Sequence, residues 1–221
     1  MRPDWRLLAN PSWRAAARRI PLLLTASRAA LAPVVVLLAF AGSRSSPPGT
    51  AFAACLVAAL LTDVFDGILA RRLGIATPTL RRLDSIADTL FYLAAALAAW
   101  HLYPAAIRSR LVPIAILAAL EIARYAFDAV KFRREASYHM WSSKLWGVAL
   151  FAGFFSLLAL GADGVLLTAA VVLGIVADLE GLAISMVLPD WRSDVPTVLH
   201  AIRLRREARE PPDERKLAEG R

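Results

Sequence analysis

The chain has 221 residues, of which 58% are hydrophobic, and a formal net charge of +8. Its mean hydropathy of +0.53 excludes an ordinary soluble protein, because this composition is typical of polytopic membrane proteins. The basic residues lie between apolar segments and share no soluble domain, which argues against nucleic-acid binding and for a role in topology and in contacts with anionic lipid.

Residues 1–19 form the first expected element. They lack the continuous apolar core and the small-residue cleavage site of a signal peptide. Trp and Leu residues alternate there with Arg2, Arg6, Arg14, Arg18 and Arg19. This pattern predicts an amphipathic helix on the membrane surface, and a disordered basic tail is the alternative.

Six apolar segments follow, each long enough for the roughly 20 helical residues that cross a bilayer. Backbone groups in lipid must be hydrogen-bonded within their own segment, so a helix is expected for each. The expected fold is therefore all-α, a polytopic membrane protein with six transmembrane helices plus the N-terminal amphipathic interfacial helix. The spans are expected at 20–41, 50–71, 84–104, 111–130, 143–161 and 164–188.

The distribution of Lys and Arg predicts the orientation. With the amino terminus in the cytoplasm, the loop residues left outside include only Arg44, Arg108 and Arg110 of the 26 basic residues. The positive-inside rule then places both termini on the cytoplasmic side of the cell membrane. After Pro189 the chain becomes polar, and residues 191–221 are expected to form a cytoplasmic interfacial helix and a disordered tail.

Four carboxylates stand at the cytoplasmic ends of the second and third spans. Asp63 and Asp66 are three residues apart, and Asp84 and Asp88 are four apart, so each pair lies on one helical face. Facing acids repel unless cations lie among them. Oxygen ligands without a nearby Cys or His favour Mg²⁺ or Mn²⁺ over zinc. The alternative is that each aspartate pairs with a neighbouring arginine in segment 71–82.

The segment from Asp63 to Asp88 resembles the signature of the CDP-alcohol phosphatidyltransferases, D-x2-D-G-x2-A-R-x8-G-x3-D-x3-D. Leu80 stands where the second Gly of that signature is expected. A second partial match is IPLLLTASR, from Ile20 to Arg28, which is similar to the family's P-N-x-L-T-x-x-R. The residues that match the first signature are Asp63, Asp66, Gly67, Ala70, Arg71, Asp84 and Asp88.

The resemblance implies a six-helix phosphatidyltransferase domain over residues 20–190. It implies an enzyme of phospholipid biosynthesis, a homodimer in the membrane, that transfers a phosphatidyl group from CDP-diacylglycerol to an alcohol acceptor and releases CMP at the cytoplasmic face. Asp88 would be the base that removes the hydroxyl proton, and two ions, Mg²⁺ or Mn²⁺, would be bound by Asp63, Asp66, Asp84 and Asp88. The residues implied to bind the CDP-lipid are Thr25, Gly67, Ala70, Arg71 and Thr77.

The acceptor site has no motif of its own. Arg124 in the fourth span and Lys144 at the start of the fifth are candidates for binding an anionic acceptor, and ordinary positive-inside residues are the alternative. Structural alternatives also exist in the nucleotide site. Gly67 and Ala70 could serve helix packing, and Thr25 could bond back to its own helix.

Two other functions stay open at this stage. With Leu80 and Leu22 at two motif positions, the chain could be a degenerate family member that binds CDP-lipid without turnover. A cation transporter that uses intramembrane carboxylates is the alternative from another class. Transport gives no role to Gly67, Ala70 and Arg71 at their motif spacing. The identity of the acceptor alcohol does not follow from the sequence.

Overall fold

The computed structural model describes most of the chain as helix, in agreement with the expected all-α class. Residues 1–10 of the interfacial segment expected at 1–19, and residues 210–221 of the region expected to end in a tail at 191–221, lie outside the described part, as does Arg44. The described residues are 11–43, 46–72, 74, 77–134, 138 and 140–209, without the side chains of 11–18, 78, 81, 208 and 209.

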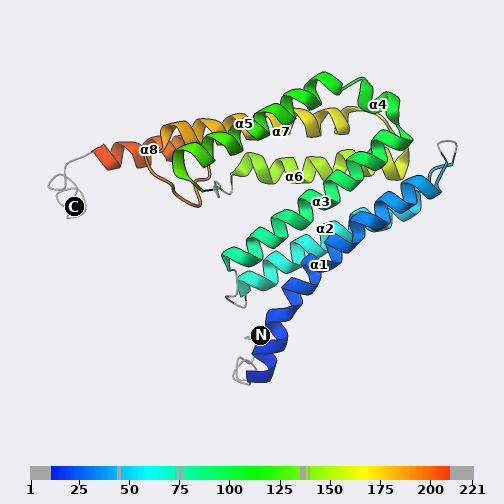
Figure 1. The fold of residues 1–221 in the computed structure, drawn as a ribbon, viewed down its shortest axis with the longest axis horizontal. Helices are drawn as coiled ribbons and strands as arrows, with labels where there is room; N and C mark the ends of the chain where they lie inside the picture. Colours follow the sequence, from blue (N-terminus) through cyan, green and yellow to red (C-terminus); the bar gives the residue numbers. More distant parts are fainter. Residues whose placement is uncertain are drawn as a thin grey trace. The chain divides into compact units, whose positions relative to one another are not determined.

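The chain divides into two compact units. The first unit comprises the residues up to Ser109 together with Phe154–Gly164. In it, α1 (Pro11–Ala41), α2 (Gly49–Arg72) and α3 (Pro78–Leu102) lie side by side (Figure 1). The short helix α4 (Pro104–Arg108) and a π-helical turn, η2 (Phe155–Ala159), complete this unit.

Small residues allow the helices of the first unit to pack closely. On α3, the side chains of Ala95, Ala98 and Ala99 are fully buried. Gly49 opens α2 directly against η2, where an added Cβ would lie 2.4 Å from the carbonyl oxygen of Ala159. Close backbone approach of this kind is typical of helix packing in membranes, where lipid supplies no hydrophobic force between helices.

The second unit comprises Arg110–Gly153 and the residues from Val165 onward. Its helices are α5 (Leu111–Phe132), α6 (Trp141–Phe154), α7 (Val165–Val187) and α8 (Val198–Arg209). Helix α5 lies beside α7, and α8 packs against α7 over a small buried core. That core includes Tyr138, Met140, Ile184, Leu188, Val195 and Ala201.

Five of the described helices are long and apolar enough to cross a membrane, which supports an integral membrane protein. They agree with five of the six expected spans. The candidates are Arg19–Ala41, Gly49–Arg72, Arg82–Leu102, Trp141–Ala159 and Val165–Val187.

The fourth expected span, 111–130, is not confirmed. It coincides with α5, which carries Glu121, Arg124 and Asp128 within its 22 residues. The separate amphipathic helix expected at 1–19 is not confirmed either, because residues 11–19 continue into α1 without interruption.

Helix α7 supplies partners for the charged side of α5. Arg124 Nε donates to Asp178 Oδ1 at 3.0 Å, and Asp128 accepts a hydrogen bond from the hydroxyl of Ser185. Lys131 Nζ donates to the carbonyl oxygens of Ser185 and Leu188, at 2.7 Å each. The polar side of α5 is therefore turned toward α7 and has specific partners there.

Replacement of Asp178 by Ala is expected to destabilise the second unit. The variant leaves the Arg124 guanidinium without its carboxylate partner in a largely buried position, a change that costs roughly 3 kcal/mol. Unfolding in detergent should show this loss, and the Arg124→Met/Asp178→Leu double variant should recover most of it. The control Asp190→Ala, at an exposed residue, should change the unfolding free energy by less than about 0.5 kcal/mol. An equal effect of both single variants would contradict the proposed contribution of the ion pair.

Candidate functional site

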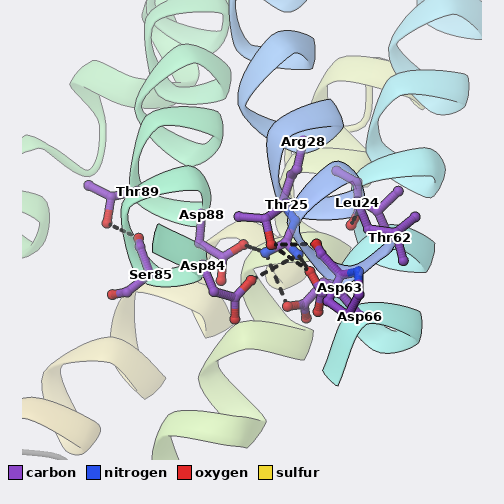
Figure 2. Close-up of polar contacts among 12 residues, drawn as sticks. Leu24, Thr25, Arg28, Thr62, Asp63, Asp66, Asp84, Ser85, Asp88 and Thr89 are labelled. Atoms are coloured by element: carbon purple, nitrogen blue, oxygen red, sulfur yellow. Dashed lines mark hydrogen bonds and ion pairs between the residues drawn. The ribbon is translucent and has the colours of Figure 1, made fainter. Parts of the chain in front are cut away.

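Two helices bring the four motif aspartates together. Asp63 and Asp66 lie one turn apart on α2, and Asp84 and Asp88 lie one turn apart on α3. Figure 2 shows the four carboxylates pointing toward one point between the helices. The helical spacing in the sequence thus corresponds to one cluster in three dimensions.

Three of these acids fit a divalent cation. Asp63, Asp66 and Asp84 each offer one carboxylate oxygen, and these oxygens lie within 4.8 Å of one another. The side chain of Asp66 is 5% exposed, whereas those of Asp63 and Asp84 are 46% and 34% exposed. A set of carboxylate oxygens with part of its surface open suits Mg²⁺ or Mn²⁺, which also take ligands from water or phosphate.

Arg28 joins the aspartates, and the sequence analysis gave it no place in the site. It comes from α1, is 1% exposed, and forms ion pairs with all four carboxylates (Figure 2). Among the described side chains, the ion pairs of these aspartates go to Arg28 and not to the arginines of segment 71–82. The alternative of neighbouring Arg partners is therefore not observed for Arg71, Arg72 and Arg82, whose side chains are described.

Two sequence signals could have indicated Arg28. It is the last residue of the partial motif IPLLLTASR, and a charged residue within an apolar span is rare without a partner. Four acids near the same depth needed a counter-charge, and Arg28 was available.

Thr25 lies next to this arginine on the same face of α1 and is 4% exposed. Its hydroxyl lies 3.0 Å from the carbonyl oxygen of Pro21 and 3.3 Å from Asp66 Oδ2. The hydroxyl has one proton, which it can donate either to Pro21 within its own helix or to Asp66 in the site. The expected contact of Thr25 with the CDP-lipid stays a prediction.

Gly67 and Arg71 are neighbours one turn apart on α2. A Cβ added to Gly67 would lie 3.3 Å from Arg71 Nη1, so the absence of a side chain gives the guanidinium room against the helix. Arg71 itself is exposed near the end of α2, and Ala70 is buried. These placements are compatible with a phosphate contact at Arg71, while Ala70 contributes to packing.

Thr77 begins the helix that carries Asp84 and Asp88. Its side-chain oxygen accepts a hydrogen bond from the backbone N–H of Leu80 at 3.2 Å, and Pro78 follows it as the first helical residue. This is a helix N-cap, which satisfies a backbone donor that would otherwise lack a partner. This capping role was not predicted above, although a Thr-Pro pair before a helix is a typical sequence signal for it.

The two expected acceptor residues lie in the second unit. Arg124 is bound to Asp178, and the Lys144 ammonium lies 4.5 Å from the centre of the Trp141 ring. Both residues have structural partners, and their role toward an acceptor stays a prediction.

Comparison with known proteins agrees with the geometry of this site. The family model for CDP-alcohol phosphatidyltransferase matches residues 18–176, which is more than half of the chain and includes all four aspartates. The chain therefore belongs to the CDP-alcohol phosphatidyltransferase family. Its members are transferases that use CDP-alcohols in phospholipid synthesis and depend in general on a metal ion. No curated protein and no solved structure matches the chain significantly.

Proposed function

We propose that this protein transfers a phosphatidyl group from CDP-diacylglycerol to an alcohol acceptor and releases CMP. The observation that carries the proposal is the convergence of the four motif aspartates of α2 and α3 on one point, inside a chain of this family. Three of them offer carboxylate oxygens within 4.8 Å of one another, which supports a shared cation.

The proposed reaction forms one bond and breaks one bond at phosphorus. The acceptor hydroxyl oxygen attacks the lipid-side phosphorus of CDP-diacylglycerol, and the bond from that phosphorus to the bridging oxygen breaks, so CMP leaves. A divalent metal at the aspartate site, when bound, supplies positive charge to the diphosphate and to the leaving oxygen.

The residues of the chain have separate tasks in this proposal. Asp63, Asp66 and Asp84 would hold the metal, and the carboxylate of Asp88 accepts the proton of the acceptor hydroxyl. Asp88 is 38% exposed, so an acceptor can reach its side chain. Arg71 binds a phosphate oxygen with its planar guanidinium. Positioning and electrostatics supply more of the acceleration than proton transfer does.

The proposal includes the arrangement in the membrane. Helix α5 is taken as the sixth span, because α7 binds Arg124, Asp128 and Lys131 and so lowers the cost of placing them in lipid. The Lys and Arg distribution favours a cell-membrane protein with both termini and the site on the cytoplasmic side. The homodimer implied by the family resemblance and the acceptor roles of Arg124 and Lys144 are kept as predictions.

The function is tested by CMP release from CDP-diacylglycerol by the purified chain, with Mg²⁺ or Mn²⁺ and a panel of alcohol acceptors. The panel contains glycerol phosphate, inositol phosphate, serine and a hydroxylated lipid. CMP release that depends on one acceptor identifies the second substrate. Binding of CDP-diacylglycerol without CMP release for any acceptor supports the degenerate member instead, and absence of both contradicts the proposal.

Gly67→Leu is expected to raise KM for CDP-diacylglycerol by roughly tenfold. Arg71 Nη1 lies 3.3 Å from the position of a Cβ at residue 67, so the leucine side chain should displace the guanidinium. The displaced guanidinium then loses its charge-assisted contact with phosphate. Gly147→Leu is the matched control, because a Cβ at Gly147 meets no atom within 4 Å. Steady-state kinetics should separate the two variants, and equal KM values would exclude the role given to Arg71.

A further inference from the structure

The guanidinium of Arg28 connects α2 and α3, the two helices that carry the aspartates. Its Nη1 contacts Asp63 Oδ1 at 3.1 Å and also Asp88 Oδ1, and its Nη2 contacts Asp66 Oδ2 at 2.6 Å and Asp84 Oδ1 at 3.1 Å. Each terminal nitrogen thus joins one acid of α2 to one acid of α3 (Figure 2). A metal ion shared by the two helices would make the same connection.

We propose that Arg28 is an internal counter-ion that competes with the divalent metal for these carboxylates, and that its side chain sets the metal affinity of the site. This inference rests on the proposed metal site. Mg²⁺ binds carboxylate oxygens at about 2.0–2.1 Å. Asp66 Oδ2 is already 2.6 Å from Arg28 Nη2, so a cation at that distance from the oxygen would lie at most about 4.7 Å from this nitrogen of a guanidinium whose charge has the same sign.

The charges of the cluster favour replacement of the Arg28 guanidinium by metal ions over the presence of both. Four ionised carboxylates exceed the single guanidinium by three charges. One divalent ion reduces this excess to one negative charge, and a second ion turns it into one positive charge. If the guanidinium leaves, four carboxylates and two divalent ions are neutral. Because net charge is costly in an apolar surrounding, binding of the second ion should displace Arg28.

The anchoring of Arg28 is consistent with release. Its Nε is buried and has no hydrogen-bond partner among the described residues. The guanidinium is therefore held through its two terminal nitrogens, both of which contact the carboxylates a metal would use. When the oxygens of Asp63, Asp66 and Asp84 bind a metal, three of the four ion pairs that hold Arg28 in this position are lost together, and the pair with Asp88 remains.

The proposal is tested on the full chain in detergent by titration with Mn²⁺, with free Mn²⁺ measured by electron paramagnetic resonance. Arg28→Gln removes the competing charge and should bind Mn²⁺ at least about tenfold more tightly than the wild type. In chelator its melting temperature should fall below that of the wild type, and Mn²⁺ should raise it by more, because the acids then lack their counter-ion. These readouts do not depend on turnover.

Two further variants make the test decisive. Arg82→Gln removes an exposed positive charge on α3, two residues before Asp84, and should change Mn²⁺ affinity by less than about twofold, since exposed charges are screened. Arg28→Lys keeps the charge, but the lysine side chain reaches fewer carboxylates. The Mn²⁺ affinity of this variant should therefore be about threefold higher than that of the wild type. If Arg28→Gln does not fold, Arg28→Lys decides the question.

The outcomes separate this inference from the proposed function. A wild type that binds Mn²⁺, with unchanged or weaker affinity in Arg28→Gln or in a folded Arg28→Lys, overturns the competition and leaves the function intact. A wild type that neither binds Mn²⁺ nor shows metal-dependent CMP release overturns the proposed function and the inference with it.

Discussion

Asp88→Asn should reduce acceptor-dependent CMP release by about 10²–10⁴-fold, the range expected when a positioned general base is removed. The amide keeps the size of the carboxylate but does not take up the proton of the acceptor hydroxyl. Asp88 lies outside the group of three acids that could share one cation, so metal binding to that group should persist. Initial rates of CMP release at saturating CDP-diacylglycerol check the loss, and Mn²⁺ titration checks that the site still binds metal.

Asp128→Asn provides the matched control for this prediction. Asp128 is also a buried aspartate, on α5, but it accepts from Ser185 and makes none of the ion pairs with Arg28. An amide oxygen can accept the same hydrogen bond, so the control should retain at least about one third of the wild-type rate. If Asp88→Asn is as active as this control, Asp88 is not the base, and its ion pair with Arg28 is only structural.

The cluster of aspartates could be predicted from the sequence because it follows from local geometry. Spacings of three and four residues place Asp63 with Asp66, and Asp84 with Asp88, on single helical faces. A short connection between the two spans then leads the chain directly from one pair to the other. The further step is that both helices pack against a common neighbour, because α2 and α3 both lie beside α1 in the structure.

The position of Arg28 could not be derived in this way. Its partners lie 35 to 60 residues further along the chain, and a pairing over that distance depends on how α1 packs against the other two helices. The charge of Arg28 also agrees with the positive-inside rule, which offered a sufficient explanation without any contact. The sequence therefore predicted the cluster of acids and its neutralisation by metal or by arginines of segment 71–82, but not by Arg28.

The partners of the charged residues on helix α5 could not be predicted from the sequence either. Its charged residues recur at helical spacing, Glu121, Arg124 and Asp128, so they share one face. These three charges keep α5 from the candidate spans, while the structure provides Asp178 and Ser185 on α7 as partners. Asp128 and Arg124 are four residues apart, a spacing that allows an ion pair within the same helix. In the structure Arg124 binds Asp178 and Asp128 binds Ser185, because the facing helix offers partners at better distances.

Chelation of divalent metal should abolish CMP release, and Mg²⁺ or Mn²⁺ should restore it. The donors of the site are oxygens of Asp63, Asp66 and Asp84, a hard set that suits these ions. Zn²⁺, which prefers nitrogen and sulfur ligands in tetrahedral sites, should restore less than about one tenth of the rate. Rates measured against free metal concentration, in buffers that fix that concentration, check both statements.

Asp66→Asn should raise the metal concentration for half-maximal activity by at least about tenfold, since loss of groups that merely orient metal ligands already costs 10–100-fold in affinity. Asp66 is the most buried of the four aspartates, and both Thr25 and Arg28 contact its Oδ2, which fixes that oxygen toward the centre of the cluster. Asp128→Asn serves again as the control and should leave the metal dependence unchanged. Full activity in chelator would contradict the metal site, whereas an unchanged metal dependence in Asp66→Asn would place the metal on the other carboxylates and away from Arg28 Nη2.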